Sequence, residues 1–136
     1  MLLSCKRDFD PINRILRSTF QGRVTDKDVL NDQRMMLLLT GFLDPLGAIV
    51  DLSDADPFEA TPDGLRHLAK LPPAMPKADR SCVVVAPSDY IFGLVRIFEI
   101  EGGATRPNLH VVRSTDEAYG ILALWEPRFE EISKFF

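Results

Sequence analysis

The sequence predicts an α/β fold: a mixed, mostly parallel sheet of five strands, with an N-terminal antiparallel hairpin and about four helices. The first observation is the valine-rich apolar run at residues 82–86, which is typical of a strand buried on both faces. The second is that a helix follows at once. Ser88 is a good N-cap, apolar residues then recur at helical spacing, and Gly102 and Gly103 end the pattern. A buried strand followed directly by a helix indicates a βαβ unit, and hence parallel strands.

The N-terminal part predicts a hairpin and a first helix. Residues 2–9 form a first strand, and residues 14–21 alternate between apolar and polar side chains, as expected for its half-exposed partner. Thr25 with Asp28 is close to a capping box, which predicts a helix over residues 26–39.

The middle of the chain predicts a central strand, a loop and a second helix. Residues 46–52 are apolar enough for a central strand, and residues 53–60 are expected to be a loop because Asp56-Pro57 interrupts them. Thr61 followed by Pro62 then starts a helix, with threonine as N-cap and proline in the first helical position.

The last strand and helix follow the glycine pair. Residues 109–112 read as a strand, and Ser114 with Glu117 is a capping box for a final helix that Pro127 ends. Helices between successive strands predict right-handed parallel crossovers. We expect one domain over residues 1–126, followed by a C-terminal tail at residues 127–136.

Composition excludes several classes of function. The 136 residues carry a net charge of −4, so nothing favours nucleic acid or an anionic membrane surface. The start of the chain lacks the long apolar region of a signal peptide, and no apolar run approaches the length of a membrane helix. Two isolated cysteines, Cys5 and Cys82, favour a reducing compartment. We therefore expect a cytoplasmic protein with no integral membrane association.

Five polar residues are candidates for a binding site at one edge of the sheet. Ligands of open α/β sheets bind outside the carboxyl ends of the strands. Asp51, Ser53, Asp54, Thr61 and Ser88 all follow or end predicted parallel strands, and two helix N-termini there could hold an anion. The alternative is that Thr61 and Ser88 are helix caps and nothing more.

Arg96 is a further candidate, because it interrupts an otherwise apolar helix. Either its charge faces a ligand or partner, or its stem is buried and its head reaches water. His67 and His110 stand far apart with no acidic residue at ligand spacing, so we expect no metal site. No nucleophile motif and no phosphate loop is present, so we expect no cofactor and no enzymatic activity.

Four short motifs resemble the small bacterial SpoIIAA-like proteins, which are related to STAS domains. They are Gly22-Arg23-Val24-Thr25, Ile49-Val50-Asp51-Leu52, the run Val85-Ala86-Pro87-Ser88-Asp89-Tyr90-Ile91-Phe92-Gly93-Leu94-Val95-Arg96, and Glu117-Ala118-Tyr119. The third is the most specific. The resemblance implies a SpoIIAA-like (STAS-like) fold, agrees with the order of elements above, and adds no enzyme.

The same resemblance implies a switch that this sequence does not carry. In anti-sigma-factor antagonists of this fold, an acid followed by a phosphorylatable serine or threonine opens the second helix. The corresponding segment here is Glu59-Ala60-Thr61, with alanine at the acceptor position and Pro62 after the threonine. We expect Thr61 to be structural. A related branch is similar to CRAL-TRIO lipid-binding domains, which keeps an apolar ligand among the hypotheses.

Two classes of function therefore remain. One is a non-enzymatic regulatory protein–protein interaction module of the antagonist type, acting through residues 53–61 and the helix after them. The other is a carrier or sensor of a small apolar or anionic ligand. We also expect a homodimer through Phe92, Ile97 and the phenylalanines of the tail, because exposed apolar patches usually mark association sites. The alternative is that the tail folds back over the helix that carries Phe92.

Overall fold

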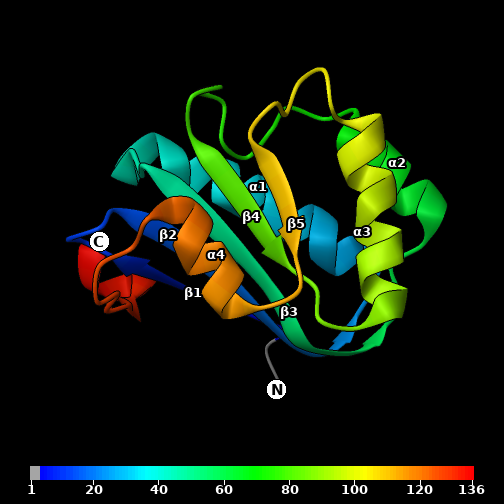
Figure 1. Cartoon of the computed structure of the whole chain (residues 1–136), viewed down its shortest axis with the longest axis horizontal. Helices are drawn as coiled ribbons and strands as arrows, with labels where there is room; N and C mark the ends of the chain where they lie inside the picture. Colours follow the sequence, from blue (N-terminus) through cyan, green and yellow to red (C-terminus); the bar gives the residue numbers. More distant parts are fainter. Residues whose placement is uncertain (1–3) are drawn as a thin grey trace.

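In the computed structural model, a six-stranded mixed sheet is covered by helices on both faces (Figure 1). The structure describes residues 4–136. The strands are β1 (Cys5–Asp10), β2 (Ile15–Val24), β3 (Gly47–Phe58), β4 (Ser81–Val85), β5 (Leu109–Val112) and β6 (Glu130–Glu131). The helices are α1 (Asp26–Leu43), α2 (Pro62–Ala69), α3 (Asp89–Glu101), α4 (Thr115–Leu122) and the short 3₁₀ helix η1 (Ile132–Phe135).

The strand order is β5-β4-β3-β2-β1-β6. β2, β3, β4 and β5 pair in parallel, while β1 pairs antiparallel with β2 and with β6. The predicted α/β class, the mixed and mostly parallel sheet, the N-terminal hairpin and the four helices are therefore confirmed. The predicted number of five strands is wrong.

Alternate residues of the strands point to opposite faces of the sheet, and each face has its own core. The three-helix face is covered by α1, α2 and α3, and the α4 face by α4 (Figure 1). The three-helix face contributes Leu16, Phe20, Ala48, Leu52 and Val84 to two hydrophobic clusters. The α4 face contributes Ile15, Ile49, Val83, Val85 and Val112 to a third.

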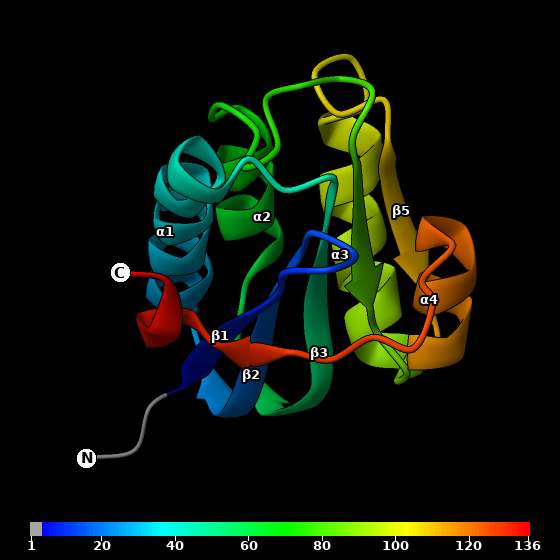
Figure 2. The same ribbon diagram turned by 90° about the vertical axis from the view of Figure 1, so that its left-hand side faces the viewer.

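The sixth strand comes from the tail. Glu130 and Glu131 pair with β1, and η1 then places Phe135 against Phe9, with ring centroids 5.2 Å apart in an edge-to-face arrangement. Figure 2 shows this segment crossing the β1 edge of the sheet from the α4 side to the α1 side. The tail thus covers an exposed strand edge and an apolar side chain. It lies at the opposite end of the sheet from α3, so it neither covers that helix nor forms one surface with Phe92 and Ile97.

β3 is longer than predicted, and most of the loop expected at residues 53–60 does not exist. β3 continues to Phe58 because the equally long β2 remains beside it, with two shifts in register that mark bulges. Ala55 and Phe58 point into the core of the three-helix face. Pairing and burial thus outweigh the turn-forming residues of this segment.

Two other predicted boundaries differ. α1 does not end near Gly41 but continues to Leu43, because Leu39 and Thr40 are buried and Asp44 caps the helix in a left-handed conformation with φ 47°. The first strand begins at Cys5. The predicted start of that strand, at residues 2 and 3, lies outside the described residues.

A fully buried carboxylate, Asp10, joins the hairpin to the tail. It accepts hydrogen bonds from the backbone N–H groups of Ile12 (2.9 Å), Asn13 (3.0 Å) and Arg128 (2.9 Å). It also accepts one from the Asn13 side chain, at 2.8 Å. Burial alone would raise the pKa of Asp10, but these hydrogen bonds outweigh it and hold the pKa below its ordinary value of 3.8.

Asp10→Asn should lower the free energy of unfolding by about 1–3 kcal/mol at neutral pH, because the hydrogen bonds lose a charged acceptor. The pKa of Asp10 is lower in the folded state than in the unfolded chain. Its contribution is therefore present above the unfolded pKa and is lost as pH falls through the folded pKa. Urea unfolding of both proteins over a series of pH values measures this.

The matched control is Asp54→Asn, since the exposed Asp54 side chain accepts no hydrogen bond within residues 4–136. This control should change the free energy of unfolding by less than about 0.5 kcal/mol. Equal effects of the two substitutions, or a cost of Asp10→Asn that does not shrink in acid, would show that Asp10 does not hold the tail in place.

Candidate functional site

The predicted residues at the carboxyl edge of the sheet do not form one cluster. Ser53 and Asp54 lie exposed on β3 rather than in a loop. Asp51 accepts a hydrogen bond from the backbone N–H of Ser53 at 2.9 Å. This is the only hydrogen bond between any two of the predicted site residues within the described part of the chain. Thr61 and Ser88 are N-caps of α2 and α3, as predicted from their neighbours.

The N-terminus of α2 already holds a carboxylate of the protein itself. Thr61 donates to Asp26 through its backbone N–H and its hydroxyl, both at 2.7 Å, and its hydroxyl accepts from Gly64. The carboxylate packs so closely that a Cβ on Gly64 would lie 2.2 Å from Oδ1 of Asp26. Asp26 thus occupies the position where we expected an external anion to bind. Ala60, at the acceptor position implied by the resemblance, is buried.

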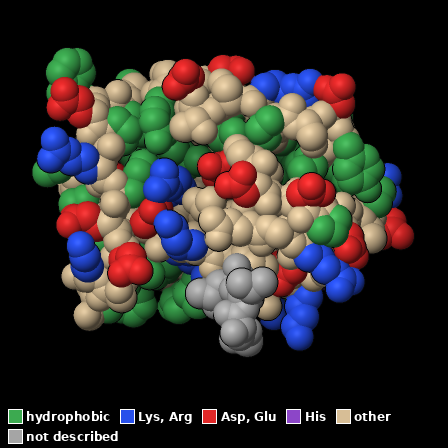
Figure 3. Space-filling view, turned by 90° about the horizontal axis from the view of Figure 1, so that it is seen from below, with side chains coloured by type: hydrophobic (Ala, Val, Ile, Leu, Met, Phe, Trp, Pro, Cys, Tyr) green, Lys and Arg blue, Asp and Glu red, His purple; other side chains and the backbone are tan. Residues whose placement is uncertain are grey.

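Arg96 points to the surface, where it forms an ion pair with Glu99 of the same helix. The end of the molecule at which the parallel strands finish shows acidic and basic side chains interspersed over its visible surface (Figure 3). Neither the Arg96–Glu99 pair nor this surface presents a cluster of like charges that would bind a charged ligand.

A cavity of about 100 Å³ lies instead inside the three-helix face. Its wall contains members of both hydrophobic clusters of that face, so it lies where the two clusters meet. The apolar lining includes Phe20, Val50, Leu52 and Val84 from the sheet, Val29 and Met36 from α1, Leu65 and Leu68 from α2, and Val95 and Phe98 from α3. The lining reaches exposed residues at Lys77 and Thr105. None of the predicted site residues belongs to it.

Asp32 of α1 is the acidic group in the cavity wall, and it is only 5% exposed. Its Oδ1 accepts hydrogen bonds from Ser18 Oγ at 2.7 Å, Arg7 Nε at 3.0 Å and Cys5 Sγ at 3.5 Å. Burial raises the pKa of Asp32, while the Ser18 hydrogen bond and the charge of Arg7 oppose that shift. These contacts fasten α1 to β1 and β2.

Arg106 is the buried basic group in the cavity wall, at 9% exposure, while Lys77 and Arg80 are the other two basic residues that line it. Its guanidinium donates to the backbone carbonyls of Ala69 (2.7 Å), Leu71 (2.9 Å) and Leu68 (3.2 Å), and it lies over the ring of Phe98. The last carbonyls of a helix lack i+4 donors and form the negative end of the helix dipole; of these three, only that of Leu68 also accepts a backbone hydrogen bond in the described part of the chain, from Leu71. Arg106 therefore caps α2, and it forms no ion pair within residues 4–136.

Cys82 also lines the cavity, near enough to Asp32 and Arg106 to respond to both charges. Burial, and after it the charge of Asp32, raise the pKa of Cys82 to about 12 against the opposing charge of Arg106. Burial likewise raises the pKa of Cys5 to about 12. Both cysteines are free. At neutral pH they are protonated thiols with little nucleophilic character, which does not favour a catalytic role.

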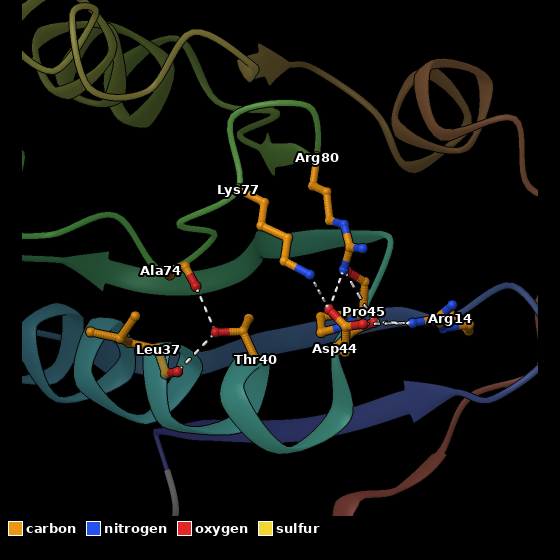
Figure 4. A network of polar contacts seen from close by, with 8 residues as sticks. All are labelled: Arg14, Leu37, Thr40, Asp44, Pro45, Ala74, Lys77 and Arg80. Atoms are coloured by element: carbon orange, nitrogen blue, oxygen red, sulfur yellow. Dashed lines mark hydrogen bonds and ion pairs between the residues drawn. The ribbon is translucent and has the colours of Figure 1, made fainter.

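Residues 72–80, which we call the cover segment, close one side of the cavity. Gln33 donates to the carbonyl of Pro72 at 2.6 Å, and the hydroxyl of Thr40 lies 2.9 Å from the carbonyl of Ala74. Figure 4 shows the other anchor: the exposed carboxylate of Asp44 contacts Lys77 Nζ at 3.0 Å and Arg80 at 2.5 Å. The hydrogen bonds from Lys77 and Arg80 hold the pKa of Asp44 below its ordinary value.

Sequence reasoning missed both buried charged groups of the cavity, Asp32 and Arg106. Asp32 carried a usable signal, because it lies three residues after Val29 and four before Met36, on the inner stripe of α1. A charged residue on such a stripe marks a buried polar site. Arg106 carried no such signal, because it follows a glycine-containing turn with no periodic pattern around it.

Comparison of the chain with protein-family models, with curated proteins and with solved structures finds no match. Across the described residues, no group of three or more His, Cys, Asp or Glu side chains could hold a metal ion. No helix in the same part of the chain combines the length and apolar character that crossing a membrane requires.

Replacing Arg106 by methionine should lower the free energy of unfolding by roughly 3 kcal/mol, because buried carbonyls at the end of α2 lose their donors. Chemical denaturation followed by circular dichroism measures the loss. The matched control is Arg96→Met, which removes an exposed arginine from an ion pair and should cost less than about 1 kcal/mol. Similar losses for the two variants would mean that Arg106 does not cap the helix.

Proposed function

We propose that this protein is a non-enzymatic binding domain that takes up a small apolar ligand in the cavity of the three-helix face. The cavity itself carries the proposal. Protein interiors are close-packed, and voids larger than a water molecule are few. An apolar cavity of about 150 Å³ takes up benzene or xenon. At about 100 Å³, this cavity fits a slightly smaller molecule, or one that extends toward the surface near Lys77 and Thr105.

The cover segment supports uptake from solution. Residues 72–80 contain no helix or strand, and their only backbone-to-backbone hydrogen bond in the described structure is internal, from Arg80 to Lys77. The anchors to Gln33, Thr40, Asp44 and Asn108 all involve side chains, and the Asp44 and Asn108 contacts are exposed. Segments with few backbone contacts open at low cost in free energy. The segment can therefore open without disturbing the sheet.

The methionines offer a direct test of uptake. Met36 and Met75 line the cavity at 1% and 9% exposure, whereas Met35 lies on the outer side of α1 at 39% exposure. Titration with cyclopentane should shift the ¹³C-methyl signals of Met36 and Met75 and leave that of Met35 in place. If the Met36 and Met75 signals show no saturable shift, the proposed function is wrong.

A filling variant separates the cavity from the rest of the core. Val84→Met places extra volume beside the cavity, so it should reduce cyclopentane binding while costing less than about 1 kcal/mol of stability. The control is Val83→Met, one residue away on the closely packed α4 face. It should retain binding while losing about 1–3 kcal/mol. If Val83→Met reduced cyclopentane binding and Val84→Met did not, the binding site would lie on the α4 face, and the proposal would be wrong.

A regulatory protein–protein interaction module of the SpoIIAA-like type is the second candidate. It is supported by the position of the most specific motif, which runs from the end of β4 through the Ser88 cap into α3. A group of exposed apolar residues also lies at one corner, where Asn13 hydrogen-bonds the backbone of the 79%-exposed Trp125. The exposed Ile12 is the neighbour of Asn13. A pull-down beside native mass spectrometry distinguishes the candidates, since a protein partner supports this one and a co-purified small molecule the first.

We also propose a cytoplasmic location, which the two free cysteines support. The homodimer expected through Phe92 and Ile97 stays a prediction for sedimentation equilibrium. Both side chains are half-buried, and Arg113 lies over the ring of Phe92 at 4.6 Å. The exposed apolar side chains of α3 are Tyr90 and Ile100 instead, so a dimer through this helix would have to use them.

A further inference from the structure

The cavity wall contains a hydrogen-bond acceptor that the protein leaves free. All hydrogen bonds to the Asp32 carboxylate go to Oδ1, and Oδ2 accepts none from residues 4–136. Yet no buried side-chain nitrogen or oxygen in the described structure lacks a partner. Oδ2 is therefore not sealed off by neighbouring atoms, although Asp32 as a whole is only 5% exposed. Because Asp32 lines the cavity, this oxygen offers a ligand one acceptor in apolar surroundings.

The charges around this oxygen disfavour an ionic ligand. Arg7 already pairs with the Asp32 carboxylate at 3.0 Å, so a cationic ligand would add an uncompensated charge to an apolar space. An anionic ligand would be repelled by Asp32. Nor does Arg106 offer its terminal nitrogens to an anion, because they donate to three carbonyls and to the hydroxyl of Thr105. The other two basic residues of the lining, Lys77 and Arg80, are already paired with Asp44. A bidentate contact with a carboxylate needs such donors free.

We infer that the ligand of this cavity is a small neutral molecule with an apolar body and one hydroxyl group, such as a short aliphatic alcohol, whose hydroxyl donates to Oδ2 of Asp32. This inference rests on the proposed function and adds the chemical class of the ligand. The apolar body contacts the side chains of the two clusters, and the hydroxyl exchanges its hydrogen bond to water for one to a charged acceptor.

Two isomers of the same size test the hydroxyl. 1-Butanol donates and accepts hydrogen bonds, whereas methyl propyl ether can only accept. Both are titrated into the intact protein, with the methyl signals of Met36 and Met75 as the readout and that of Met35 as the reference. We expect butanol to bind about tenfold more tightly than the ether, since a hydrogen bond to a charged acceptor has roughly that effect on affinity.

The Asp32→Asn variant tests the acceptor. Ser18 and Arg7 donate to the Oδ1 position, so the amide oxygen takes that place and the amide NH₂ group takes the place of Oδ2. The variant then presents a donor to the cavity, and the preference for butanol should fall to about threefold or less. The control is Asp54→Asn, because Asp54 is an exposed residue of β3 that does not line the cavity. This variant should keep the tenfold preference.

Each outcome decides one proposal. Cyclopentane binding together with ether binding as tight as butanol would overturn the hydroxyl ligand and leave the proposed function standing. Tighter binding of pentanoate or butylammonium than of butanol would overturn the neutral class. No saturable shift of Met36 and Met75 with any of these compounds would overturn the proposed function as well. Since the comparison of isomers uses the unmodified protein, it holds even where Asp32→Asn fails to fold.

Discussion

The handedness of the strand connections determines how the two faces of this sheet are covered. β2, β3, β4 and β5 lie side by side in sequence order, so every crossover advances in the same direction across the sheet. Crossovers of one hand that advance in one direction all pass over the same face. α1, α2 and α3 must therefore share the three-helix face. Only α4 and the chain after it, which no longer connect parallel strands, can cover the other.

Crowding three helices onto one face has a consequence for packing. The core of that face divides into two clusters, one around α2 and α3 and one around the C-terminal half of α1, and the cavity lies where they meet. Asp32 fastens α1 to β1 and β2, while Arg106 fastens the end of α2 to the chain before β5. Because both contacts are buried and directional, they resist the small movement of α1 toward α2 that would close the cavity.

The sequence predicted those elements whose residues follow a regular pattern. The valine-rich β4 and the capped helices α2, α3 and α4 could be located because apolar periodicity and caps reflect local physics. β6 could not, since Glu130 and Glu131 have no strand propensity and pair only because β1 offers a free edge. The second half of β3 could not either, because its Asp-Ala-Asp-Pro segment is extended only through pairing with β2.

The site was harder to predict than the fold for a related reason. Caps such as Thr61 and Ser88 stand out in a sequence, but their polar groups are largely used by the backbone of their own helices. A cavity forms where residues distant in sequence fail to pack closely. No local sequence pattern can therefore predict it. Asp32 is the exception, since its place on the apolar stripe of α1 is enough to indicate a buried charge.

Crystallography under xenon pressure tests most directly whether the three-helix face encloses a usable apolar cavity. Xenon enters apolar cavities and scatters strongly, so its position is seen without any assumption about the natural ligand. We expect a xenon atom between Met36, Leu65 and Val84, with the surrounding side chains in place. A structure in which those side chains fill the space, or in which xenon binds only elsewhere, would contradict the assignment of this cavity as a binding site.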